Sequence, residues 1–263
     1  MITRLLTGLV IGPIAIASII FGTIPMILVV LLCTILAAQE LLIMLSKNGH
    51  KPLMMPAYFL LTAIIGSTLF QETSFLWDTT AAKIIFLGAL GFYGIELILK
   101  RPIFPKNDLA VTLRVVLLMG GTFSFLYLIR TLPGGIFLVL YCCMLTWIGD
   151  IAALLVGKKF GKHPLSLLLS PKKTIEGAIG SLIVSLLLSW ACALAFGLDI
   201  RLFTLYGVLI SILGLLGDLH ESMMKRFFHV KDSSNLLPGH GGMYDRADST
   251  LFVMPVMYYL FTL

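Results

Sequence analysis

The sequence predicts an all-α, polytopic integral membrane protein with about nine transmembrane helices and a cytoplasmic N-terminus. Of the 263 residues, 59% are hydrophobic and only 12% are charged, and the mean hydropathy is +1.02. Soluble domains carry about 25% charged residues. Apolar runs long enough to cross a bilayer recur along the chain. The basic residues gather in alternate connections between these runs, as they do in membrane proteins of fixed orientation.

Each predicted helix is an apolar run close to the length of about 20 residues that a bilayer core requires. The first two runs are separated only by a tight turn from Gly22 to Pro25, and the last run is short. The nine predicted spans are 5–21, 25–45, 53–70, 81–99, 109–129, 134–156, 176–196, 202–224 and 249–263.

The orientation follows from the positions of the basic residues. An N-terminus in the cytoplasm places 15 of the 19 Lys and Arg residues in inner connections. Lys83, Arg130 and Arg201 fall in outer connections, and Arg114 lies just within an inner boundary. The positive-inside rule therefore holds at every loop. The formal net charge of +6 is explained in this way without a nucleic-acid partner.

Residues 1–21 allow two interpretations. A single arginine before a short apolar run is also typical of a cleaved signal peptide, whose removal would leave the remaining topology unchanged. We expect a retained span because the apolar pattern resumes directly after Pro25.

The two halves of the chain differ in their polar connections. Residues 1–130 have short ones and are expected to form a scaffold of transmembrane helices that also offers dimer contacts. Residues 131–263 contain two long cytoplasmic segments, 157–175 and 225–248, which are rich in Gly, Lys, Asp, Ser and His. We therefore expect the catalytic region in the C-terminal half.

Acidic and basic residues are concentrated between positions 214 and 249. Asp218, Glu221 and Lys225 share one helix face, and Asp245 and Asp248 lie three residues apart where the last span begins. Carboxylates beside a membrane normally face a cavity, a partner or an ion. Two such pairs brought together would form an all-oxygen site suited to Mg²⁺. The alternative is that these acids simply pair with nearby bases and orient the loop.

The run PGHGG follows in the same segment. Its glycines, Gly239, Gly241 and Gly242, expose backbone N–H groups and let a phosphate approach closely. A glycine cluster alone is a weak signal. Its position next to His240 and to the helix entry that carries Asp245 and Asp248 makes a phosphate site the better interpretation.

A second polar stretch runs from 147 to 177. Asp150 lies in the cytoplasmic third of the sixth span and has no basic residue at i+3 or i+4, so it needs a partner from another helix. Lys158, Lys159 and Lys162 are interpreted as ordinary positive-inside anchors, and Lys158→Ala is expected to have little effect.

The motif SPKKTIEG closes this stretch. It gathers Ser170, Lys172, Lys173 and Thr174 before a helix that begins at Ile175. A helix N-terminus attracts phosphate through its free N–H groups and its dipole. The Thr174 hydroxyl can also serve as the helix N-cap, and the two roles are compatible.

These motifs resemble those of the bacterial phosphatidate cytidylyltransferase family, also called CDP-diacylglycerol synthase. The resemblance covers SPKKTIEG, GDLHESMMKR and KDSSNLLPGHGGMYDRADS and extends back to about residue 147, whereas the N-terminal half matches only in hydropathy. The departures from the family pattern are His220 in place of an aromatic residue, Ser234 in place of a glycine, and Ile151 and Leu154 after Asp150.

The resemblance implies transfer of a cytidylyl group from CTP to phosphatidic acid, yielding CDP-diacylglycerol and pyrophosphate for phospholipid biosynthesis. The lipid phosphate would attack in line, assisted by Mg²⁺ on Asp218, Asp245 and Asp248, with K⁺ as a second ion. The further predicted catalytic residues are Lys225, Arg226, Arg246 and His240. The predicted substrate-binding residues are Lys172, Lys173, Ser170, Thr174, Ser222, Lys231, Asp232, Gly241, Gly242 and Asp150, with Glu176 lining the same pocket.

The expected setting is the bacterial cytoplasmic (inner) membrane, with the active site facing the cytoplasm. CTP would arrive from water and the acyl chains of phosphatidic acid from between the helices. The resemblance also implies a homodimer.

Three other functions fit parts of the sequence. A polyprenol kinase would need similar phosphate-binding residues. A CDP-alcohol phosphotransferase is disfavoured because its D-G-x-x-A-R element is absent. A transporter could use Glu40, Glu96 and Asp150 for ion coupling, but no internal repeat is visible. Glu40 and Glu96 could also snorkel, pair with a base from another span, or line the path of the lipid.

Overall fold

Helices make up most of the part of the chain that the computed structural model describes, residues 2–68 and 80–263. Every predicted transmembrane range overlaps a helix, so the all-α class is confirmed apart from one small hairpin. The elements in chain order are α1 (Ile2–Phe21), α2 (Thr23–Lys47), α3 (Met54–Ser67), α5 (Thr80–Leu99), α6 (Asp108–Val116), the π-helix η2 (Leu117–Gly121), α7 (Thr122–Thr131), α8 (Gly135–Phe160), β1 (Pro164–Ser166), β2 (Ser170–Thr174), α9 (Ile175–Phe196), α10 (Ile200–Phe227), α11 (Tyr244–Ala247) and α12 (Thr250–Phe261).

Within the described residues, five helical segments are long and apolar enough to cross a membrane: Thr23–Lys47, Asp108–Thr131, Gly135–Phe160, Ile175–Phe196 and Ile200–Phe227. They support an integral membrane protein. The nine-span count and the cytoplasmic N-terminus stay predictions. Residues 69 and 70 of the predicted span 53–70, and the side chains of Arg4 and Lys83, lie outside the described residues.

Side-chain caps fix the first turns of three helices. Asn107 accepts hydrogen bonds from two backbone N–H groups of α6 at 2.8 and 3.2 Å, and Asp199 accepts one from Arg201 at 2.7 Å at the start of α10. The Thr174 hydroxyl accepts the Gly177 N–H at 3.1 Å, so the predicted N-cap of α9 is confirmed. Each cap satisfies a backbone donor that the helix itself leaves free.

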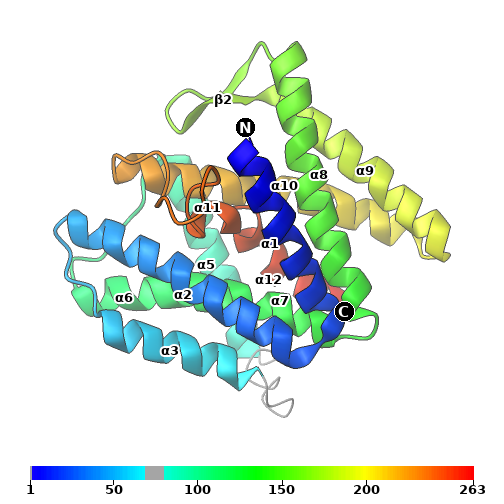
Figure 1. Cartoon of the computed structure of the whole chain (residues 1–263). Helices are drawn as coiled ribbons and strands as arrows, with labels where there is room; N and C mark the ends of the chain where they lie inside the picture. Colours follow the sequence, from blue (N-terminus) through cyan, green and yellow to red (C-terminus); the bar gives the residue numbers. More distant parts are fainter. Residues whose placement is uncertain (1, 69–79) are drawn as a thin grey trace.

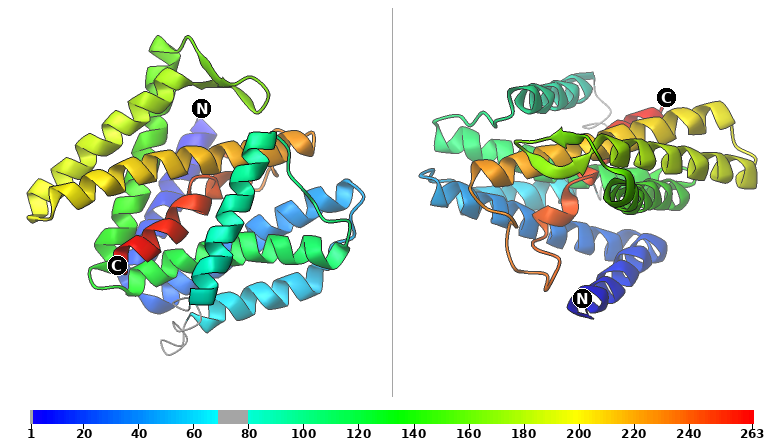
Figure 2. Two further views of the ribbon diagram at one scale, coloured as in Figure 1. Left: turned by 180° about the vertical axis from the view of Figure 1, so that it is seen from behind. Right: turned by 90° about the horizontal axis from the view of Figure 1, so that it is seen from above.

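The helices form two groups joined by α12 (Figure 1). In the first group α2, α3 and the continuous α6–η2–α7 segment lie side by side. In the second group α8, α9 and α10 pack on one another, and the hairpin projects from the α8–α9 end, as the left view of Figure 2 shows. Because α12 packs against both α7 and α10, it holds the two groups together.

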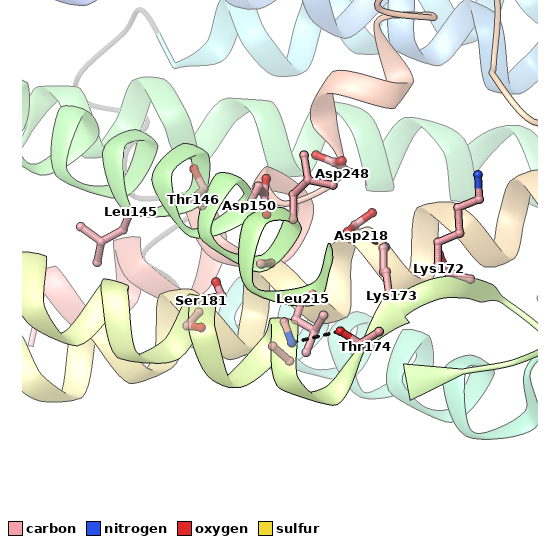
Figure 3. Close-up of a pocket in the computed structure, with 18 of the residues that line it drawn as sticks. Leu145, Thr146, Asp150, Lys172, Lys173, Thr174, Ser181, Leu215, Asp218 and Asp248 are labelled. Atoms are coloured by element: carbon pink, nitrogen blue, oxygen red, sulfur yellow. Dashed lines mark hydrogen bonds and ion pairs between the residues drawn. The ribbon is translucent and has the colours of Figure 1, made fainter. Parts of the chain in front are cut away.

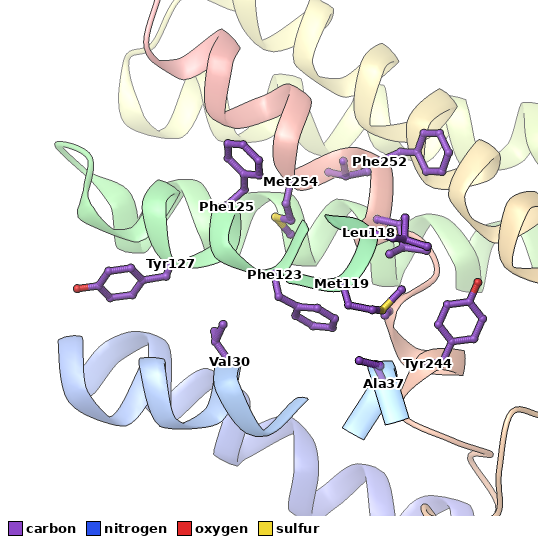
Figure 4. Packing of buried hydrophobic residues seen from close by; sticks show 14 of the residues in the cluster. Val30, Ala37, Leu118, Met119, Phe123, Phe125, Tyr127, Tyr244, Phe252 and Met254 are labelled. Atoms are coloured by element: carbon purple, nitrogen blue, oxygen red, sulfur yellow. The ribbon is translucent and has the colours of Figure 1, made fainter. Parts of the chain in front are cut away.

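The hydrophobic core lies around η2, α7 and α12 (Figure 4). Phe125 of α7 packs against Tyr258 of α12, with ring centroids 5.2 Å apart. Met254 is fully buried near Phe125, and Met119 of η2 is fully buried on the side that faces Ala37 of α2. The burial of these side chains fixes α12 and, through it, the short α11 that precedes it.

The α8–α9 connection forms an antiparallel hairpin that the sequence does not predict. β1 pairs with β2 so that Pro164 lies opposite Thr174 and Ser166 opposite Ser170. The Ile175 N–H donates to the His163 carbonyl at 2.9 Å, which joins the hairpin base to α9. The strands are short and rich in Ser, Lys and Pro, so they lack the alternating apolar pattern by which strands are recognised.

Candidate active site

A cavity of about 600 Å³ lies between α8, α9, α10 and the hairpin (Figure 3). Carboxylates, lysines and hydroxyl groups make up its polar wall: Asp150, Asp218, Asp248, Lys158, Lys172, Lys173, Thr146, Ser170, Thr174, Ser181 and Ser211. Leu145, Leu154, Ile210 and Leu215 contribute an apolar wall. A cavity of this size holds a small organic ligand, and its charged groups select an anion together with a cation.

The three carboxylates of the cavity come from different elements. Asp150 lies in α8 and Asp218 in α10, and Asp248 follows α11 directly. Gly217 allows the chain at Asp248 to contact α10, because a Cβ atom there would collide with the Asp248 carbonyl oxygen. Ser249 then joins two of the acids: its N–H donates to Asp248 Oδ1 at 2.6 Å, and its hydroxyl donates to Asp150 Oδ2 at 3.5 Å.

The charges in this cavity favour a bound cation. Burial, together with the nearby negative charge of Asp218, raises the pKa of Asp248 to about 6. The Ser249 N–H, Arg246 and Lys173 counteract this increase in part. Two carboxylates that repel each other in a half-buried site are stabilised by a cation between them.

Lys173 is in direct contact with one of these acids, Asp218. Its ammonium group forms an ion pair with Asp218 Oδ2 and lies 3.5 Å from the Ser222 hydroxyl. The side chains of Lys173 and Asp218 are 24% and 26% exposed, so a ligand in the cavity can reach both. Lys172 is the adjacent residue on β2 and also lines the cavity.

A second charged cluster surrounds Asp245. Lys225 Nζ lies 2.9 Å from Asp245 Oδ1 and 2.5 Å from Glu221 Oε1. Asp245 Oδ2 accepts hydrogen bonds from Gly242 N at 2.7 Å and from Ser233 N at 3.0 Å, and it lies 3.1 Å from Ser233 Oγ. Burial raises the pKa of Asp245, but the hydrogen bonds from Glu221, Gly242 and Lys225 together with the Lys225 charge outweigh it and hold the pKa at about 2.

The structure therefore groups the acids differently from the sequence-based expectation. Asp218 lies with Asp248 and Asp150 in the cavity, whereas Asp245 is not among the residues that line it. Both oxygens of Asp245 are already occupied by Lys225 and by donors of the 233–242 segment. Asp245 and Asp248 lie three residues apart, as predicted, but they contact different partners.

Comparison with known proteins decides the family. A sequence model described as "Cytidylyltransferase family" matches residues 2–263. The chain belongs to the cytidylyltransferase family. A phosphatidate cytidylyltransferase of Staphylococcus haemolyticus (strain JCSC1435) is 35% identical over 257 residues, which cover 97% of this chain and 96% of that protein. A phosphatidate cytidylyltransferase of Bacillus subtilis (strain 168) is 34% identical over 271 residues, with 99% and 97% covered.

A third relative has a higher identity over a shorter match. The phosphatidate cytidylyltransferase of Staphylococcus aureus (strain COL) is 42% identical over 162 residues, which cover 61% of this chain and 62% of that protein. The full-length matches correct the expectation that the N-terminal half resembles the family only in hydropathy.

Several predicted site residues of this cytidylyltransferase lie outside the cavity wall. Arg226, Lys231, Asp232 and Arg246 are exposed. Arg226 Nη1 donates to the Val230 carbonyl at 3.3 Å, which closes the end of α10. Their predicted contacts with substrate stay predictions.

The PGHGG run forms a tight turn beside α11. The Leu237 N–H donates to the Gly241 carbonyl at 2.8 Å, and the His240 N–H donates to the Leu237 carbonyl at the same distance. Gly241 has φ of 79°, a conformation in which glycine carries no steric cost. In this turn the Gly242 N–H is directed at Asp245 rather than at open space.

Two residues near the hairpin, Lys158 and Glu176, lie in other positions than the sequence predicts. Lys158, interpreted from the sequence as an anchor, lies in the cavity wall. Glu176, expected to line the pocket, is not among the lining residues. It accepts hydrogen bonds from Lys162 N at 3.1 Å and His163 N at 3.3 Å, and lies 2.6 Å from His163 Nδ1. Glu176 therefore fastens the hairpin to α9.

The two glutamates left open by the sequence both have defined partners. Glu96 pairs with Arg114 of α6 at 2.7 Å and lies 3.4 Å from His220 of α10. This is pairing with a base from another helix, one of the three possibilities considered. His220 also packs against Tyr93, with ring centroids 4.9 Å apart, so the histidine occupies an aromatic environment. Glu40 instead contacts the 233–244 segment. Only their placement in apolar helices marks these glutamates in the sequence.

The cavity is compatible with a divalent ion. In the described part of the chain, no three His, Cys, Asp or Glu side chains form a ready metal site. Mg²⁺ does not require one, because it usually takes one or two carboxylates and completes its shell with water and phosphate oxygens. Asp218 and Asp248 supply hard oxygen ligands of this kind.

Proposed function

We propose that this chain transfers a cytidylyl group from CTP to phosphatidic acid and releases pyrophosphate and CDP-diacylglycerol. An oxygen of the lipid phosphate attacks the α-phosphorus of CTP while the bond to the β-phosphate oxygen breaks. No protein nucleophile is needed, since such reactions depend on positioning and charge neutralisation. The full-length similarity to proteins named phosphatidate cytidylyltransferase supports this assignment.

The observation that carries the proposal is the meeting of acids and lysines in one cavity. Asp218 and Asp248 lie opposite Lys172 and Lys173, and an apolar wall continues from the same cavity. A nucleoside triphosphate with its cation fits the polar part. The acyl side of a phospholipid fits beside the apolar part.

In this proposal Asp218 and Asp248 hold a divalent ion, with Asp150 behind them. Such an ion, when bound, neutralises charge on the triphosphate and stabilises the leaving pyrophosphate. With such an ion held by Asp218 and Asp248, Lys173 would be available to bind a phosphate oxygen of CTP. Asp245 keeps Lys225 in position and reaches an ion only if Lys225 leaves it.

The remaining parts of the proposal concern the setting. K⁺ acts as a second ion, the protein is a homodimer, and the cavity opens to the cytoplasmic side of the bacterial inner membrane. The concentration of basic residues in alternate connections supports this orientation.

The deciding experiment is turnover of purified protein in detergent with phosphatidic acid and CTP labelled in the α- or the γ-phosphate. We expect the α-label in the lipid product and the γ-label in pyrophosphate, with turnover abolished by EDTA and restored by Mg²⁺. Replacing K⁺ by Na⁺ tests the second ion. Recovery of the γ-label alone in the lipid would instead identify a lipid kinase.

A further inference from the structure

Glu40 is a buried carboxylate of α2 whose contacts all lie in one distant segment. The side chain is 7% exposed. Its Oε1 accepts hydrogen bonds from Ser234 Oγ at 2.6 Å and Met243 N at 3.0 Å, and its Oε2 from Ser233 Oγ at 2.7 Å and Tyr244 N at 2.9 Å. Among the described residues, no Lys, Arg or His forms an ion pair with it. Hydroxyl and backbone donors alone therefore compensate its burial.

The segment that Glu40 holds has little regular structure of its own. Between α10 and α11, the described residues form one isolated bridge, Leu237 with Gly241. A connection of this length has considerable conformational freedom unless side chains restrain it. Glu40 restrains it at both ends, at the serines near its beginning and at the first turn of α11.

The fit around Glu40 is too close for any side chain at position 242. A Cβ atom on Gly242 would collide with the Glu40 carboxylate and with the Ser233 hydroxyl. The Gly242 N–H donates to Asp245 on the other side of the same turn. Glu40 and Asp245 thus hold one glycine turn between them.

Ser233 connects these two carboxylates directly. Its hydroxyl lies 2.7 Å from Glu40 Oε2 and 3.1 Å from Asp245 Oδ2, and its N–H donates to Asp245. The hydroxyl has one proton and can donate to only one acid at a time. Lys225 continues the chain of contacts from Asp245 to Glu221.

We propose that Glu40 is a positioning residue for the reaction: through Ser233 and the α11 backbone it fixes Asp245 and, three residues on, Asp248. This inference rests on the proposed function. It assigns a part in the active site to α2, a helix of the N-terminal half. Glu40 touches neither substrate nor ion in this assignment, and it acts through the segment it holds.

The test compares Glu40→Gln, Ser233→Ala and the double variant with Thr34→Val, a buried control on the same helix. Thr34 bonds only within α2, to the Val30 carbonyl. An amide at position 40 must turn its NH₂ group toward the N–H of Met243 or Tyr244, so one backbone donor loses its acceptor. We expect kcat to fall about tenfold in Glu40→Gln, the cost of one such charged hydrogen bond, while KM for CTP changes less than about twofold. Thr34→Val should match wild type.

Two further readouts separate positioning from general stability. Because Glu40 and Ser233 contact each other and hold the same segment, their effects on kcat should not multiply in the double variant. Trypsin should cleave after the exposed Lys231 faster in Glu40→Gln, relative to the bond after Lys106 in another exposed connection, at an unchanged thermal midpoint.

The proposal would be overturned if the fold decrease in kcat of the double variant equalled the product of the decreases in Glu40→Gln and Ser233→Ala. It would also be overturned by wild-type kcat with wild-type cleavage after Lys231, or by a kcat loss fully explained by a lower fraction of folded protein. If wild-type protein does not turn over CTP and phosphatidic acid at all, the proposed function fails. The cleavage after Lys231 would then still decide whether Glu40 holds the segment.

Discussion

At the scale of single residues, the charged side chains of the C-terminal half divide into two clusters. In the cavity, Lys173 and Asp218 are in contact and both remain partly exposed. Around Asp245, Lys225 is closely paired with Glu221 and Asp245, and both carboxylates are buried. The first cluster can exchange protein contacts for ligand contacts, whereas the second keeps a local conformation. Mutations in these two clusters should therefore have different consequences.

Lys173→Met should weaken CTP binding. The substitution removes a cation from the cavity wall and leaves Asp218 without its partner, so the triphosphate loses a charge-assisted contact. We expect KM for CTP to rise about tenfold or more, measured by initial rates at saturating phosphatidic acid. Lys159→Met is the matched control, because Lys159 is exposed beside the Phe160 ring and does not line the cavity. Equal effects of the two substitutions would contradict the role of Lys173.

The dependence of activity on Mg²⁺ should distinguish the aspartates. Asp218→Asn and Asp248→Asn should raise the half-activating Mg²⁺ concentration by about tenfold or more, because each removes a charged oxygen ligand. Asp245→Asn should lower kcat with little change in the Mg²⁺ requirement, since Lys225 occupies that carboxylate. Mg²⁺ titrations of the three variants measure this directly. A shifted requirement in Asp245→Asn alone would restore Asp245 as the main ligand.

At the scale of elements, the site depends on how closely α11 approaches α10. Asp248 belongs to neither helix, and its position follows from the contact of its backbone with Gly217. The core around Phe125, Met254 and Tyr258 holds α12 in place. Because Asp248 lies just before α12, this packing also fixes the backbone at Asp248. The geometry of the cavity is therefore set by apolar packing some distance from it.

Gly217→Ala should disrupt the site through this contact. The added methyl group collides with the Asp248 carbonyl oxygen, so α11 must move away from α10. We expect a loss of kcat of about tenfold or more and a destabilisation of about 1–3 kcal/mol, measured by turnover and by thermal unfolding in detergent. Gly66→Ala in α3 is the control, because its Cβ meets nothing within 4 Å. Wild-type activity in Gly217→Ala would show that the contact is unimportant.

At the scale of the whole molecule, buried charges connect helices that are distant in sequence. Glu96 of α5, Arg114 of α6 and His220 of α10 meet in a buried group, and the Arg114 guanidinium lies 4.5 Å from the centroid of the Phe104 ring. This group ties α5 and the first helix group to the helix that carries Asp218. It contains no residue of the cavity wall.

Arg114→Met should therefore lower stability more than catalysis. It leaves Glu96 buried without its cation, and breaking a buried ion pair in this way costs about 3–5 kcal/mol. We expect a clear fall in the thermal midpoint in detergent, with kcat at low temperature close to wild type. Arg114→Met combined with Glu96→Gln should recover part of the loss, because the uncompensated charge is removed. No recovery in the double variant would contradict the pairing.

The class of the protein and most of the charged residues that line its cavity could be predicted from the sequence. Apolar runs require helices in a bilayer, since every backbone polar group must find its partner within the segment. The acids, lysines and glycines of 147–177 and 214–249 predict a site for phosphate and metal. In the structure, five of these residues line one cavity: Asp150, Asp218, Asp248, Lys172 and Lys173. The hydroxyl cap of Thr174 also follows from local chemistry alone.

Which of these residues are in contact depends on the tertiary structure. Asp245 and Asp248 look equivalent three residues apart, but α11 ends between them and their carboxylates take different partners. The partner of Glu40 lies about two hundred positions away, and that of Glu96 on another helix. Local propensity and periodicity fix elements and faces, whereas the contact of two side chains far apart in sequence depends on how all the helices pack at once.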